Sequence, residues 1–368
     1  MMIPLDVDEL LRTRRVVVCC GSGGVGKTTT AAALALRAAE LGRRTVVLTI
    51  DPARRLATAM GLAELDNVAR RVSGVDEGAG GSLDALMLDM KGTFDDIVRR
   101  TTDGPRAAMI LENPFYQSLS GHFAGTQEYM AMEKLGELDE SHQWDLIVVD
   151  TPPSRSALDF LDAPQRLASF LDGRLARMLG GTARAGGRMG KVALGVVGSA
   201  ASRVLGTQLF NDLSKFVTAL EATFGGFRVR AEATYLRLQR PDVSFLVVAT
   251  PEPDALREAS FFTGRLADRR MPLAGLVLNR VHEVAVAMPA DRAEAAAEAL
   301  SKSDSAVSEL LHAYAAALRL RTREGRLLAR FVSAHTPVAV RQVAALSEDV
   351  HDLAGLRRIG ELLGGQQT

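Results

Sequence analysis

Short unbroken runs of apolar residues alternate along this chain with longer segments whose apolar positions recur at helical spacing. The runs of strand-like length and composition are 16–20, 45–50, 85–89, 146–149, 243–249 and 273–278. A segment rich in alanine and leucine, 27–41, follows the first run and meets no helix breaker before Gly42. Strands without polar alternation are typical of a parallel sheet buried on both faces. The pattern therefore predicts an α/β fold, a mostly parallel sheet with helices on both faces and functional loops at the carboxyl ends of its strands.

The interval 151–242 interrupts this alternation. Its pattern is mainly helical, and it is too long for a simple crossover between two strands. We therefore predict a core formed by 1–150 and 243–368, with a helical subdomain, 155–242, inserted into it. Between Gly173 and Asn211 there is no Asp or Glu, and six positive charges fall there: Arg174, Arg177, Arg184, Arg188, Lys191 and Arg203.

The amino-acid composition restricts the class of protein but does not identify a ligand. Of the 368 residues, 47% are apolar and 24% are charged, as in ordinary folded domains. The 44 Lys and Arg balance the 44 Asp and Glu, so no overall field attracts nucleic acid, and we expect no nucleic-acid partner. The two cysteines, Cys19 and Cys20, are adjacent, which excludes a disulfide-stapled scaffold. Because no stretch has the length of a signal or a membrane span, we expect a cytoplasmic protein.

One glycine-rich segment predicts a specific phosphate-binding site. Residues 21–28, Gly-Ser-Gly-Gly-Val-Gly-Lys-Thr, match the phosphate-loop pattern G-x-x-x-x-G-K-[ST] in full and lie between a predicted strand and a predicted helix. Such a loop directs backbone N–H groups at phosphate oxygens, beside the positive end of the helix. We expect Lys27 to neutralise the β- and γ-phosphates, Thr28 to contact Mg²⁺ and Thr29 to reach the α-phosphate. The fold class is thus that of a P-loop NTPase, with ATP bound by Gly23, Gly24, Val25, Gly26, Lys27, Thr28 and Thr29.

Hydrolysis needs a group that orients water and a carboxylate near the magnesium ion. Asp51 and Asp150 are the candidates, because each ends an apolar strand whose carboxyl end should lie at the edge that carries the phosphate loop. The alternative is that either aspartate only caps the helix or turn that follows it.

Three motifs in order resemble those of the ArsA-type ATPases, which include the arsenite-pump ATPase and the eukaryotic ATPase that targets tail-anchored membrane proteins. They are the phosphate loop, Asp-Pro-Ala-Arg-Arg-Leu at 51–56 and Asp-Thr-Pro-Pro-Ser at 150–154. The resemblance spans most of the chain. It implies a Mg²⁺-dependent ATPase in which Asp51 activates water and Asp150 holds Mg²⁺ through a coordinated water. It also implies that Asn279 bonds adenine, with the loop around Ala344 and Leu346 covering the base.

The sequence departs from this family at Ser22. Members of the family usually carry a lysine there, and in their closed dimers it reaches the nucleotide of the opposite subunit. A serine hydroxyl cannot supply that positive charge. We hypothesise that the chain forms a dimer with a related subunit that retains the lysine; a slow homodimer that tolerates Ser22 is the alternative.

The resemblance leaves the client open. The chain lacks the thiols that bind arsenite, and it lacks the Cys-x-x-Cys pair of the targeting ATPase. The basic, apolar insertion suits a hydrophobic client segment, a membrane protein or a membrane surface, so the protein could also act at the membrane periphery. An internally packed lobe with solvated arginines explains the same composition. The competing functions are a non-hydrolysing ATP-sensing adaptor and a partition-type ATPase, although the latter normally lacks such an insertion.

Overall fold

A computed structural model describes residues 3–51, 55–113, 116, 126–152, 229–230, 232–284 and 288–365, with backbone only for 126–129. The chain divides into two compact units. The first, here the sheet unit, comprises Met1–Met87, His142–Ala157 and Leu238–Thr368. The second, here the helical unit, comprises Leu88–Ser141 and Leu158–Arg237.

The helical unit differs in extent from the subdomain that the sequence suggested. It also includes Leu88–Ser141, which sequence analysis counted with the core. Its described helices include α4 (Met90–Thr101), α5 (Gly104–Leu111) and α7 (Thr126–Ser141), and α4 packs against α5 and α7; residues 232–237 are also helical. The predicted boundaries 155–242 remain a prediction, because residues 153–228 lie outside the described part of the chain.

The sheet unit holds nine strands, and its prediction as a mostly parallel α/β sheet is confirmed. The strands are β1 (Ile3–Pro4), β2 (Val16–Cys20), β3 (Arg44–Thr49), β4 (Arg70–Arg71), β5 (Ser82–Met87), β6 (Leu146–Asp150), β7 (Val243–Ala249), β8 (Leu273–Val281) and β9 (Ala339–Ala344). They lie in the order β1-β9-β8-β7-β2-β6-β3-β5-β4, and every pair is parallel except β4 with β5. The three central strands β7, β2 and β6 are buried throughout, which explains their unbroken apolar sequences.

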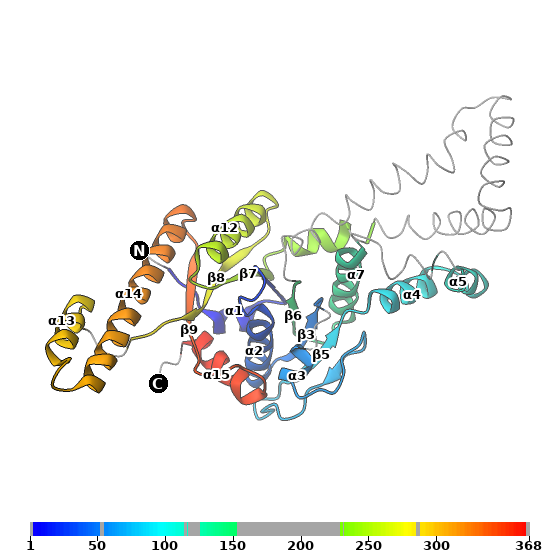
Figure 1. Cartoon of the computed structure of the whole chain (residues 1–368). Helices are drawn as coiled ribbons and strands as arrows, with labels where there is room; N and C mark the ends of the chain where they lie inside the picture. Colours follow the sequence, from blue (N-terminus) through cyan, green and yellow to red (C-terminus); the bar gives the residue numbers. More distant parts are fainter. Residues whose placement is uncertain are drawn as a thin grey trace, which may run out of the picture. The chain divides into compact units, whose positions relative to one another are not determined.

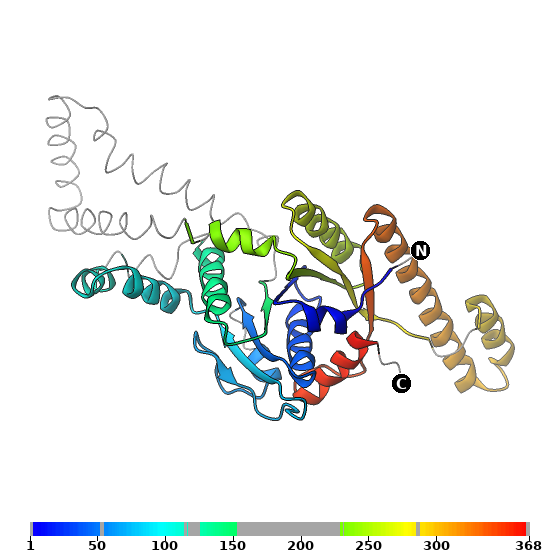
Figure 2. The ribbon, with the colours of Figure 1, turned by 180° about the vertical axis from the view of Figure 1, so that it is seen from behind.

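Helices cover both faces of this sheet, as Figures 1 and 2 show. The helices of the unit are α1 (Val7–Thr13), α2 (Lys27–Glu40), α3 (Arg55–Ala59), α12 (Pro253–Asp268), α13 (Ala290–Leu300), α14 (Ser305–Ala334) and α15 (Leu353–Gly364). On one face, α2 packs against α1, α15 and the strands β3 and β6. On the other face, α12 contacts β7, β8 and α14. The buried alanines of α2 let its backbone approach the sheet closely.

Two features of the sheet unit differ from the sequence pattern. The alanine-rich segment from Ala290 to Leu320, whose composition is helical throughout, is divided between α13 and α14. The division occurs because the side chain of Asp304 accepts a hydrogen bond from the N–H of Val307 at 3.1 Å and starts a new helix. Strand β9 was not expected, because only Val340 and Val343 of its residues are buried and no continuous apolar run marks it. No helix in the described ranges is long and apolar enough to cross a membrane.

Candidate functional site

The predicted phosphate loop joins β2 to α2 in the centre of the sheet unit. Gly24 and Gly26 adopt left-handed φ angles of 77° and 90°, which side chains with a Cβ rarely adopt. Gly26 is also the residue that caps α2, and a Cβ placed on it would overlap the side-chain amide of Asn279. Nothing lies within 4 Å of a Cβ placed on Gly24.

This difference predicts unequal costs for two alanine substitutions. Gly24→Ala should lower the free energy of unfolding only by the cost of the left-handed backbone, about 1–2 kcal/mol. Gly26→Ala should lower the free energy of unfolding further, because the substitution has the same backbone cost and also displaces Asn279. Denaturant unfolding of the two variants measures the difference; equal midpoints and equal slopes would contradict the close approach of Asn279.

Lys27 is the first residue of α2, and its side chain turns back towards the loop. Its side chain is buried, and Nζ donates a hydrogen bond of 2.7 Å to the carbonyl oxygen of Ser22. Burial lowers the pKa of Lys27, while the negative charge of Asp150 opposes that shift. An ammonium group held inside a loop of backbone N–H groups provides a strongly positive site for phosphate.

Asp150 ends β6, which lies between β2 and β3, and it is fully buried. Thr49 Oγ1 donates to its Oδ2 at 3.0 Å, whereas Oδ1 has no hydrogen-bond partner among the described residues. Burial raises the pKa of Asp150 to about 6, although hydrogen bonds from Thr28 and Thr49 and the charge of Lys27 oppose the rise. A buried carboxylate oxygen without a partner, beside a threonine hydroxyl, fits the hard oxygen ligands that Mg²⁺ requires.

Asp51 follows β3, the strand next to β6. Its N–H donates to Thr49 Oγ1 at 3.2 Å, so Thr49 contacts both aspartates. The charge of Asp51 raises the pKa of Lys27 and that of Asp150, which places all three in one electrostatic cluster. The prediction that the two strand ends meet beside the loop is therefore confirmed as geometry; that Asp51 activates water stays a prediction. Residues 52–54 lie outside the described part.

Thr151 follows Asp150 at the carboxyl end of β6. Thr151 is buried, and both its N–H and its hydroxyl donate to the carbonyl oxygen of Cys19, at 3.3 and 2.8 Å. This double contact fixes the start of the 150–154 motif against the strand that leads into the phosphate loop. Residues 153–154 lie outside the described part.

Asn279 lies near the end of β8 and contacts the loop directly. Its Nδ2 donates to the carbonyl oxygen of Val25 at 2.9 Å. Ala344 ends the neighbouring strand β9 and pairs with Val281 of β8, and the N–H of Ala345 donates to the carbonyl oxygen of Val281 at 2.9 Å; Leu346 comes next in the chain. The predicted contacts of Asn279, Ala344 and Leu346 with adenine stay predictions.

Both cysteines, Cys19 and Cys20, are buried in β2 and free. Burial raises the pKa of each, that of Cys20 to about 12, so neither is a reactive thiol. In the part of the chain that the structure describes, no group of three His, Cys, Asp or Glu could hold a metal ion by itself.

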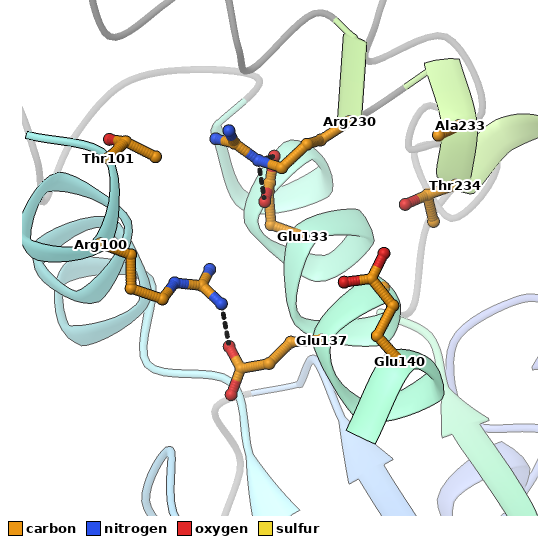
Figure 3. A pocket seen from close by; sticks show the side chains of 9 residues that line it. Arg100, Thr101, Glu133, Glu137, Glu140, Arg230, Ala233 and Thr234 are labelled. Carbon is orange, nitrogen blue, oxygen red and sulfur yellow. Dashed lines mark hydrogen bonds and ion pairs between the residues drawn. The ribbon is translucent and has the colours of Figure 1, made fainter. Parts of the chain in front are cut away.

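A separate cavity of about 270 Å³ lies in the helical unit, and sequence analysis gave no sign of it (Figure 3). Its lining residues are Arg100, Thr101, Glu133, Gly136, Glu137, Glu140, Arg230, Ala233 and Thr234. The Nε of Arg230 lies 3.0 Å from both carboxylate oxygens of Glu133, and Arg100 lies 3.8 Å from Glu137. Since charges of both signs already pair across it, the cavity shows no preference for a ligand of either charge.

Comparison with known proteins agrees with this geometry. The family model described as anion-transporting ATPase, ArsA, matches residues 14–313. An ATPase GET3 of Chaetomium globosum and an ATPase get3 of Neurospora crassa are each 26% identical to the chain over 271 residues, which cover 73% of this chain and 74% of each relative. An ATPase get3 of Aspergillus terreus is 31% identical over 163 residues, covering 44% of this chain and 46% of that protein.

Proposed function

From the premise that this chain belongs to the anion-transporting ATPase family and is an ATPase, we propose that it binds ATP with Mg²⁺ at the loop 21–29 and hydrolyses it there. The observation that carries this proposal is the burial of Lys27 within the loop, between the charges of Asp51 and Asp150. Lys27, Asp51 and Asp150 form a small charged site at the start of α2, which suits a polyphosphate and its cation. Keeping such charges close together and buried costs free energy when no ligand compensates them.

In this proposal each residue has one task. The backbone of Gly23 to Gly26 and the ammonium of Lys27 bind the phosphates. Thr28 and, through a water, Asp150 would hold Mg²⁺, which would supply positive charge to the phosphates. Thr29 bonds the α-phosphate, and Asn279 with Ala344 and Leu346 holds the base. Asp51 orients the attacking water and accepts its proton.

The test is the rate of ATP turnover in the presence of Mg²⁺, with and without Asp51→Asn. We expect the variant to lose at least about 100-fold in turnover, because asparagine cannot accept the proton, while it still binds ATP. The matched control is Asp145→Asn, a change of the same kind at the amino end of β6. Equal and negligible rates for the native chain and for Asp51→Asn would indicate the adaptor, which binds ATP and scarcely hydrolyses it.

We further propose that the ATPase works as a dimer, in which a related subunit with lysine at the position of Ser22 completes the site. Ser22 is only partly buried at the mouth of the loop, and its side chain brings no charge. Turnover should therefore rise when such a subunit is added. If addition leaves the rate unchanged and the chain alone is fully active, the dimer is a homodimer.

For the inserted segment we propose a client that is a hydrophobic segment or a membrane protein, handled in the cytoplasm or at the membrane periphery. Its support is the sequence alone, which combines six cations with apolar residues between Gly173 and Asn211. Deletion of residues 180–206 should abolish capture of a hydrophobic helical peptide and spare ATP binding. Unchanged capture would reject this role.

A further inference from the structure

Glu324 is a buried carboxylate in a part of α14 that is otherwise basic. Between Leu310 and Ala334 it is the only acidic residue, and five arginines lie in the same stretch. All five arginines are exposed, whereas the side chain of Glu324 is only 4% exposed. A glutamate is rarely buried without a partner, because the loss of hydration is costly. The contacts of Glu324 therefore have to account for its position.

Both carboxylate oxygens of Glu324 bind one residue, His282, which directly follows β8. Oε2 accepts a hydrogen bond from the backbone N–H of His282 at 3.1 Å, and Oε1 lies 2.6 Å from its ring Nδ1. In the ranges that the structure describes, no lysine or arginine forms an ion pair with Glu324. The carboxylate thus holds the end of β8 by its backbone and by its side chain.

The segment held in this way also contacts the phosphate loop. Asn279 precedes His282 by three residues, is buried, and donates from Nδ2 to the carbonyl oxygen of Val25 at 2.9 Å. A Cβ placed on Gly26 would lie 2.3 Å from the same Nδ2. Since one residue spans at most about 3.5 Å, the two contacts are separated by no more than about 10 Å of chain. Little chain is available to absorb a displacement of His282 before it reaches Asn279.

The backbone between these two contacts is not a regular strand. The pairing of β8 with β9 shifts register between Leu278 and Val281, and Arg280 has a left-handed φ angle of 59°. An arginine in this conformation costs free energy and persists only where its surroundings hold it. Glu324 provides such a hold immediately after the irregular stretch.

We infer that Glu324 is a positioning residue for the base of the nucleotide: by fixing His282, it holds Asn279 in the place where Asn279 can bind adenine. This inference rests on the proposed binding of ATP with Asn279 at the base. The phosphates are bound by the loop, on which Glu324 makes no contact among those described. Loss of Glu324 should therefore weaken a ligand that carries the base and spare a ligand made of phosphates alone.

The experiment compares two ligands by calorimetry, each with Mg²⁺ and the full chain: a non-hydrolysable ATP analogue, and inorganic tripolyphosphate, which has no base. Glu324→Ala should weaken the analogue about tenfold, the effect of one well-placed hydrogen bond, and change the affinity for tripolyphosphate by less than about twofold. Glu309→Ala removes an exposed glutamate of the same helix, so it is the matched control and should change neither affinity.

Further variants separate positioning from general support of the fold. Glu324→Gln keeps an oxygen that can accept from the N–H of His282, so it should retain most of the affinity for the analogue. Asn279→Ala should reproduce the loss caused by Glu324→Ala, and the double variant should lose no more than Asn279→Ala alone, because both changes remove the same contact. His282→Ala keeps the backbone bond and should weaken the analogue about threefold. It provides the test if Glu324→Ala does not fold.

Equal losses of both ligands in Glu324→Ala would mean that the carboxylate supports the phosphate loop as a whole, which would overturn the inference. Native affinity of Glu324→Ala for the analogue, or additive losses in the double variant, would overturn it too. If the native chain binds neither ligand, the proposed function itself fails. If it binds both, and Asn279→Ala weakens the analogue while Glu324→Ala does not, the base site is correct and only the role of Glu324 is wrong.

Discussion

Replacement of Lys27 by methionine is expected to weaken the binding of ATP by at least about 100-fold, the largest loss that any single change in this chain should cause. The ammonium of Lys27 is buried and already oriented by its hydrogen bond to the carbonyl oxygen of Ser22. Phosphate can therefore form a charge-assisted hydrogen bond without the entropy cost of ordering a long side chain. Methionine keeps the length of the stem and removes only the charge and its donors.

Calorimetric titration with Mg²⁺ and a non-hydrolysable ATP analogue measures this loss. Lys91→Met is the matched control, because Lys91 is an exposed residue of α4 that pairs with Asp95 at 2.8 Å. The control should bind the analogue as the native chain does. If Lys27→Met retains native affinity, the phosphates do not occupy the loop.

The sequence predicted the sheet and the glycine-rich loop between β2 and α2, because both depend on local patterns. Unbroken apolar runs that alternate with helical segments are typical of strands buried between two layers of helices, and the structure shows such a parallel sheet. In such a sheet the ends of β3 and β6 meet at one edge, so Asp51 and Asp150 had to lie near Lys27. The adjacency of two strand ends follows from topology once the strands are known.

The contacts made from β8 could not be found in this way. They lie at a shift of register against β9, a strand with only two buried residues and therefore no clear signal in the sequence. The cavity of the helical unit could not be predicted either, because the Arg230–Glu133 pair joins segments that are distant in sequence. Interactions set by tertiary pairing leave no periodicity to read.

Replacement of Asp150 by asparagine is expected to stabilise the nucleotide-free protein while it abolishes Mg²⁺-dependent turnover. Burial raises the pKa of Asp150 to about 6, from an ordinary value of 3.8. The folded protein therefore binds a proton more tightly than the unfolded chain. Above pH 6 the buried charge costs stability, on the order of 3 kcal/mol at most, and the cost disappears as the pH falls from 6 towards 4.

Asparagine removes this charge and keeps a side-chain oxygen that can accept the hydrogen bond from Thr49. At pH 7.5 the free energy of unfolding should rise by about 1–2 kcal/mol, less than the full cost because the new amide group is buried. Near pH 4.5, where Asp150 is mostly protonated, the gain should shrink. Turnover should fall at least about 100-fold, since a neutral amide holds the magnesium shell poorly.

Asp145 provides the opposite case within the same strand region. Hydrogen bonds from Arg44 lower the pKa of Asp145, so its charge stabilises the fold above the ordinary pKa, and this contribution is lost as the pH falls through the lowered value. Asp145→Asn should therefore reduce stability at pH 7.5 and leave turnover near native. Urea unfolding at both pH values, together with turnover assays, compares the two variants. If Asp150→Asn instead destabilises the nucleotide-free protein at pH 7.5, the carboxylate of Asp150 serves the fold, and its assignment to the magnesium site is wrong.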